Sequence, residues 1–132
     1  MSSQETMEGV TVAEQQSVLI VDGSEETREV LKMALERRGV RTLATALAGR
    51  GVELARRHQP DLIVVDLELV DSSPADLSFL LAESSPGAPA SLVMLGSVRR
   101  DDPPLPQGQL VHKPYHYGPL IRKIEELLAK TK

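Results

Sequence analysis

PDLIVVDLEL, residues 60–69, sets the architecture expected for this chain. Its apolar residues 62–65 are rich in β-branched side chains and follow a Pro-Asp turn, which is typical of a strand buried on both faces. Asp66 ends that run. Because open parallel sheets place their ligands just outside the carboxyl ends of their strands, Asp66 is a candidate site residue. An aspartate is also a common first residue after a strand, and that plainer interpretation stays open.

Four more short aliphatic runs have the character of strands, and helical patterns alternate with them. The expected strands are residues 18–21, 40–45, 92–95 and 110–112. The expected helices run from the N-cap Ser24 to Gly39, from Leu47 to about residue 58, over residues 75–83, and from about Gly118 to residue 130. Three prolines at 103, 104 and 106 argue against a regular helix before the last strand, so a fourth helix there is predicted to be short or missing.

This alternation predicts the α/β class, with a mostly parallel five-stranded sheet covered by helices on both faces as a three-layer sandwich. The length of 132 residues suits a single core. Residues 1–16 are polar and acidic without sustained periodicity, so we interpret them as a flexible leader before a domain spanning residues 17–130.

Composition excludes several functional classes. The chain has no cysteine, so disulfides, thiolate metal sites and cysteine nucleophiles are ruled out. Its formal net charge of −4, with Lys and Arg scattered in pairs, argues against direct nucleic-acid binding. No apolar run approaches the roughly 18 to 20 residues that span a bilayer, and no signal-peptide profile precedes the domain. A cytoplasmic protein without membrane contact is therefore expected.

The predicted strands end in residues that would meet at one edge of the sheet: Asp22, Asp66, the Gly96-Ser97 pair and Lys113. Two carboxylates beside a lysine suit phosphoryl transfer, with an aspartate as nucleophile, a divalent cation that offsets negative charge, and the lysine on the transferred oxygens. Plainer alternatives stay open. Asp22 could serve the first turn of the following helix, Lys113 could be solvated, and Ser97 could be an ordinary turn serine.

Four segments together resemble the receiver domain of bacterial response regulators over residues 17–130. They are VLIVDGSEETREVLKMALERRGV (18–40), PDLIVVDLEL (60–69), SLVMLGS (91–97) and LVHKP (110–114). The resemblance implies a flavodoxin-like sheet of order 2-1-3-4-5 and phosphotransfer from a histidine kinase or phosphotransfer protein. It makes Asp66 the phosphoacceptor, Lys113 the lysine before a cis proline, and Asp22 and Asp66 ligands of Mg²⁺.

The sequence also departs from the receiver pattern. The second acid after the first strand, which touches magnesium in the family, falls on Gly23, and Glu68 offers a tentative replacement oxygen. The switch hydroxyl falls on Gly96, with Ser97 next to it, and the switch aromatic falls on Leu110. The resemblance thus predicts an altered switch and weaker Mg²⁺ binding.

Three functions remain in competition at this point. The first is a non-enzymatic signalling switch phosphorylated on Asp66. The second is a degenerate receiver that binds a partner protein without phosphate, with Leu110, Tyr115 and Tyr117 on the contact surface. The third, a flavodoxin-like enzyme or nucleotide binder, has the least support because the first strand-to-helix turn, DGSEE, lacks a phosphate-cradling glycine pattern. His58, His112 and His116 are not spaced as metal ligands with carboxylates, so structural or solvated roles are expected for them.

Overall fold

The computed structural model describes residues 15–69, 90–97 and 108–130. Within them the chain alternates strands and helices as the sequence predicts. The elements are β1 (Ser17–Val21), α2 (Glu25–Glu36), β2 (Arg41–Thr45), α3 (Ala48–His58), β3 (Leu62–Asp66), β4 (Ser91–Leu95), β5 (Gln109–Val111) and α5 (Tyr117–Lys130). The helix predicted over residues 75–83 and the segment predicted to have a short or missing fourth helix lie outside the described residues.

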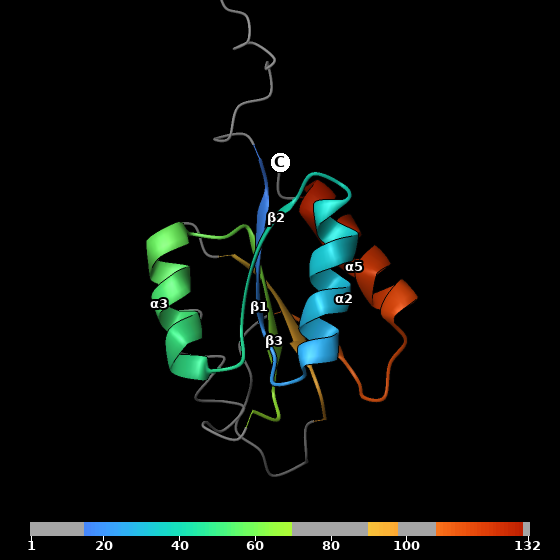
Figure 1. Ribbon diagram of the computed structural model, residues 1–132. Helices are drawn as coiled ribbons and strands as arrows, with labels where there is room; N and C mark the ends of the chain where they lie inside the picture. Colours follow the sequence, from blue (N-terminus) through green and yellow to red (C-terminus); the bar gives the residue numbers. More distant parts are fainter. Residues whose placement is uncertain (1–14, 70–89, 98–107, 131–132) are drawn as a thin grey trace, which may run out of the picture.

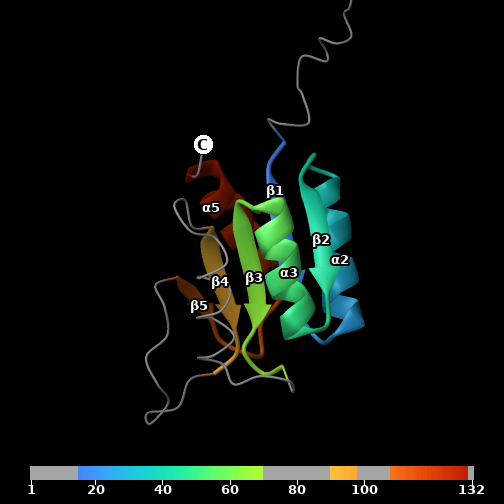
Figure 2. The same ribbon diagram turned by 90° about the vertical axis from the view of Figure 1, so that its left-hand side faces the viewer.

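The five strands form one parallel sheet in the order β2-β1-β3-β4-β5, which confirms the flavodoxin-like topology. Figure 2 shows this sheet with α3 in front of it. The winding reverses between β1 and β3, which are neighbours in the sheet although α2, β2 and α3 separate them along the chain. A crevice forms at such a reversal, outside the carboxyl ends of the strands, and it is the usual ligand position in open α/β sheets.

The strands alternate their apolar side chains between two cores, one on each face of the sheet. Leu19, Ile63 and Met94 pack with α3, whereas Ile20, Val64 and Val93 pack with α2 and α5. Figure 1 shows α3 on one side of the sheet and the α2–α5 pair on the other. Both faces of β1 and β3 are thus covered, which explains their continuous apolar sequences and confirms the three-layer arrangement.

Helix α2 begins and ends where its sequence signals predict. The hydroxyl of Ser24 accepts a hydrogen bond from the Thr27 amide at 3.2 Å, and Glu25 and Glu26 occupy the positive end of the helix dipole. Gly39, just beyond the helix, has a φ of +81°, a conformation that glycine adopts without a steric penalty. The helix therefore has a fixed start directly after Asp22.

Helix α3 corrects one expectation. The sequence pattern places Leu47 inside this helix, on its apolar face, but Leu47 is the residue before the helix and its surface is 59% exposed. The helix instead buries Ala48, Gly51, Leu54 and Ala55. A Cβ atom built on Gly51 would lie only 2.8 Å from a methyl carbon of Val21, so the absence of a side chain lets α3 approach β1 closely.

Helix α5 buries Leu120, Ile124 and Leu128 along one face, at the helical spacing predicted from the sequence. It packs beside α2 on the same face of the sheet (Figure 1). No helix in the described part of the chain is long and apolar enough to cross a membrane.

Candidate functional site

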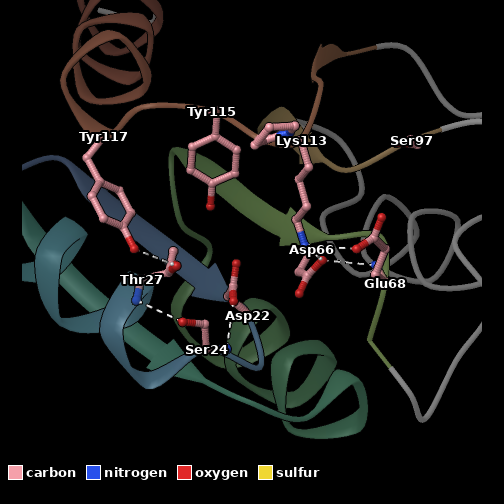
Figure 3. A pocket seen from close by; sticks show the side chains of 10 residues that line it. Asp22, Ser24, Thr27, Asp66, Glu68, Ser97, Lys113, Tyr115 and Tyr117 are labelled. Atoms are coloured by element: carbon pink, nitrogen blue, oxygen red, sulfur yellow. Dashed lines mark hydrogen bonds and ion pairs between the residues drawn. The ribbon is translucent and has the colours of Figure 1, made fainter.

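A cavity of about 540 Å³ opens at the carboxyl edge of the sheet. Side chains from the ends of β1, β3 and β4, the start of α2 and the β5–α5 connection surround it (Figure 3). Its lining residues are Asp22, Ser24, Thr27, Asp66, Glu68, Ser97, Lys113, Pro114, Tyr115 and Tyr117. The structure thus brings together five residues singled out in the sequence: Asp22, Asp66, Glu68, Ser97 and Lys113.

The sheet itself holds the two aspartates side by side. Val21 of β1 pairs with Val65 of β3, so Asp22 and Asp66 follow at equivalent positions on neighbouring strands. Backbone hydrogen bonding continues past the strand ends. The Asp22 amide donates to the Thr45 carbonyl at 3.0 Å, and the Leu67 amide donates to the Leu95 carbonyl at 2.9 Å. The carboxylates therefore extend from a rigid edge.

Asp66 is buried and holds two hydrogen bonds on one oxygen. Its Oδ1 accepts from Lys113 Nζ at 2.7 Å and from the Glu68 amide at 2.9 Å. Lys113 Nζ also lies 3.3 Å from Glu68 Oε1, so the lysine bridges two carboxylates (Figure 3). Residues 47 positions apart in the chain thus form one charged cluster.

The cluster keeps the lysine charged. Burial alone would lower the pKa of Lys113, but the hydrogen bonds and negative charges of Asp66 and Glu68 outweigh burial and raise that pKa above its ordinary value. The following peptide bond, Lys113-Pro114, is cis, as the resemblance predicts. Lys113 is therefore a permanent ammonium donor at neutral pH, directed at Asp66.

The two carboxylate oxygens of Asp22 have different environments. Its Oδ1 accepts a hydrogen bond from the Ser24 amide at 2.8 Å, which supports the turn into α2. Its Oδ2 is buried and has no hydrogen-bond partner among the described residues. Burial raises the pKa of Asp22, the Ser24 hydrogen bond opposes that rise, and the charge of Asp66 adds to it. The helix-start interpretation of Asp22 thus applies to Oδ1, and the site interpretation applies to Oδ2.

The other residues predicted for the switch lie at the edge of this site. Gly96 directly follows β4 with a φ of +146°, and a Cβ atom there would lie 3.2 Å from Leu67 Cβ. Any other residue at this position would be strained. Ser97 is exposed and lines the cavity, whereas Leu110 is in β5, packs against the α3-side core and is not among the lining residues.

Sequence reasoning missed part of the cavity wall. Thr27 Oγ1 lies 3.1 Å from the Tyr117 hydroxyl and so connects the first turn of α2 to the start of α5. Arg28 Nη1 donates to the Asp22 carbonyl at 2.8 Å. Tyr115 and Tyr117, which the sequence places on a possible partner surface, both line the cavity, and Tyr115 also packs against the core beneath α5. Their closeness to Lys113 was the one signal available in the sequence.

The donor chemistry of the site fits a hard divalent cation in kind. Asp22 Oδ2 is a buried carboxylate oxygen to which no described residue donates a hydrogen bond, and Asp66 is at the equivalent position on the neighbouring strand. Within the described residues, no group of three or more histidine, aspartate or glutamate side chains is arranged to hold a metal ion. Mg²⁺ is commonly bound by one or two carboxylates with waters and phosphate oxygens completing its shell, and the pair Asp22 and Asp66 matches that donor set.

Comparison with known proteins identifies the family. TcrX of Mycobacterium tuberculosis, named as a probable transcriptional regulatory protein, is 29% identical over 118 residues, covering 87% of this chain and 50% of TcrX. The polar-differentiation response regulator DivK of Brucella ovis is 26% identical over 118 residues, covering 86% of this chain and 96% of DivK. This chain therefore spans about half of the first relative and nearly all of the second. No family model matches.

Solved structures agree in fold. A two-component response regulator from Clostridium difficile superimposes with a TM-score of 0.72 at 19% identity, covering 89% of this chain and 99% of that one. Together, the relatives and the fold make this chain a response regulator receiver domain of the two-component class. The relatives are named as regulators rather than as enzymes.

Proposed function

We propose that this receiver domain accepts a phosphoryl group on Asp66 from a histidine kinase or a histidine phosphotransfer protein. The observation that carries the proposal is the 2.7 Å contact between Lys113 Nζ and Asp66 Oδ1, with the buried Asp22 carboxylate on the adjacent strand. This arrangement joins a nucleophile, a fixed positive charge and a second acid in one cavity. Those are the components that an acyl phosphate needs at an aspartate.

The chemical step is a transfer between two nucleophiles. An oxygen of the Asp66 carboxylate attacks phosphorus, a P–O bond forms, and the P–N bond to the donor histidine breaks with its electron pair returning to the imidazole nitrogen. Because Oδ1 already accepts hydrogen bonds from Lys113 and Glu68, Oδ2 is the oxygen assigned to the attack. The Lys113 ammonium offsets negative charge on the transferred oxygens, where a preorganised charge is most effective.

We assign Mg²⁺ to Asp22 and Asp66, with Glu68 as a further oxygen donor once it leaves Lys113. The cation would supply positive charge to the phosphoryl oxygens. Gly23 provides no carboxylate at the position where receivers usually carry their second acid. With one fewer anionic ligand, Mg²⁺ affinity is lower than in receivers that have both acids.

A second function is favoured by Gly96. The φ of +146° and the short approach to Leu67 make the usual switch threonine or serine strained at this position, and Leu110 provides no aromatic ring to rotate. A receiver without these parts could serve as a phosphate-independent binding module. Its contact surface would be the one around Leu110, Tyr115 and Tyr117.

Beryllofluoride, a mimic of the aspartyl phosphoryl group, separates the two functions. With millimolar Mg²⁺, the phosphoacceptor function predicts saturable amide shifts centred on Asp66, Glu68 and Lys113. In Asp66→Asn the same titration gives no shifts, because the amide is a poor nucleophile and ligand. Unchanged wild-type spectra would contradict phosphoacceptance and favour the binding module.

A further inference from the structure

The cavity has a second wall, beside Lys113, made by two tyrosines and the first turn of α2 (Figure 3). The rings of Tyr115 and Tyr117 meet edge to face, with centroids 6.1 Å apart and planes at 71°. The Tyr117 hydroxyl contacts Thr27, whereas the Tyr115 hydroxyl points into the cavity toward the space beside Asp22 and Asp66 (Figure 3). The two phenols therefore differ in hydrogen bonding: the Tyr117 hydroxyl lies 3.1 Å from Thr27 Oγ1, whereas Thr27 is near Tyr115 but acts there only on its pKa.

Tyr115 is chemically suited to donate a hydrogen bond in this cavity. Burial raises the pKa of its phenol, the nearby Thr27 hydroxyl partly opposes that effect, and the negative charge of Asp22 adds to it. The phenol thus keeps its proton at neutral pH. Its ring is partly buried against the core between the sheet and α5, which fixes the direction of the hydroxyl.

At the end of β4, position 96 provides no hydroxyl to the site, and the neighbouring Ser97 is exposed at the cavity rim. Gly96 has no side chain, and its backbone conformation disfavours gaining one. Tyr115 is two residues beyond Lys113 on the same connection, so one segment presents both an ammonium and a phenol to the cavity that contains Asp66.

We propose that Tyr115 is a phosphoryl-binding residue whose hydroxyl donates a hydrogen bond to an oxygen of the group on Asp66, in place of the hydroxyl that position 96 lacks. The proposal rests on phosphoacceptance by Asp66. It assigns Tyr117 a different role, as the residue that fixes the start of α5 against Thr27. The two tyrosines are thus a matched pair for an experiment.

The test compares Tyr115→Phe with Tyr117→Phe, since each variant loses one hydroxyl and keeps its ring. Beryllofluoride is titrated at fixed, saturating Mg²⁺ and the amide shift of Glu68 is followed, with thermal unfolding as a check on folding. We expect the apparent beryllofluoride affinity to fall about tenfold in Tyr115→Phe, a size typical of a hydrogen bond to a charged group, and less than twofold in Tyr117→Phe. Mg²⁺ affinity without beryllofluoride should be the same in wild type and Tyr115→Phe.

The possible failures are distinguishable. Equal beryllofluoride affinity of wild type and Tyr115→Phe would overturn the role of Tyr115 and leave Asp66 as phosphoacceptor. A loss of Mg²⁺ affinity in Tyr115→Phe without beryllofluoride would also overturn it, because the phenol would then act through Asp22. A wild-type protein that gives no response to beryllofluoride would overturn both proposals.

Discussion

Gly23 is the single residue whose replacement most directly tests the metal site. A Cβ atom at this position meets only Leu69 Cδ2, at an ordinary 3.6 Å, so an aspartate can be accommodated. Gly23→Asp should tighten Mg²⁺ binding by about tenfold or more, because it adds a carboxylate beside Asp22. Titration of Mg²⁺ followed by amide shifts or calorimetry measures the change.

Gly23→Asn is the control for this substitution. It adds a side chain of nearly the same size without the negative charge, so it should leave Mg²⁺ affinity close to that of the wild type. If Gly23→Asp binds Mg²⁺ no better than Gly23→Asn does, position 23 does not face the cation and our alignment of this turn is wrong.

The positions of candidate site residues were predictable from the sequence where those residues lie at the end of a strand. Asp22, Asp66 and Lys113 each follow a recognisable aliphatic run, and parallel strands bring such residues to one edge. Thr27 and Tyr117 were not predictable, because their contact depends on how α5 packs beside α2. The strain at Gly96 was also hidden, since a sequence does not show a backbone angle.

Helix α3 contains two glycines whose environments differ, and they test how closely it packs on the sheet. A Cβ atom at Gly51 would lie 2.8 Å from Val21 Cγ2, and Val21 is fully buried, so Gly51→Ala forces α3 away from β1. We expect the free energy of unfolding to fall by about 1 to 3 kcal/mol, as in other overpacked cores. Chemical denaturation followed by circular dichroism measures this loss.

Gly49→Ala provides the comparison within the same helix. Gly49 is exposed, and no atom lies within 4 Å of a Cβ atom built there. Alanine should therefore stabilise the protein by up to about 1 kcal/mol through its helix propensity. A similar gain in Gly51→Ala would show that α3 does not depend on this close approach.

Helices and strands were largely predictable because their apolar periodicity reflects burial. The five strands and the capped start of α2 follow from residue pattern alone. Leu47 was assigned wrongly, because a leucine one position before a helix fits the same periodicity as one inside it. Only the packing of α3 shows that the residue faces solvent.

In the molecule as a whole, the candidate site connects the buried centre of the sheet to its partly exposed edge strand. β1 and β3 are almost completely buried, whereas β5 has three residues, is partly exposed and, among the strands that the structure describes, pairs only with β4. The salt bridge from Lys113 to Asp66 connects the segment after β5 to the end of β3. Binding at Asp66 is therefore placed to alter the order of the β5 edge.

Lys113→Met should show this connection in the protein without any ligand. Methionine keeps the apolar stem but removes the ammonium, so β5 and the start of α5 lose their charged contact with the centre of the sheet. We expect their amide hydrogen exchange to accelerate roughly fivefold, corresponding to about 1 kcal/mol for an ion pair of this kind, while β1 and β3 remain unchanged. Lys32→Met, which removes an exposed pair with Glu36 on α2, should leave β5 exchange as in wild type. Equal acceleration of exchange in β1, β3 and β5 would mean that the salt bridge stabilises the entire fold rather than this edge. In that case a change at Asp66 would have no local effect on β5 and the start of α5.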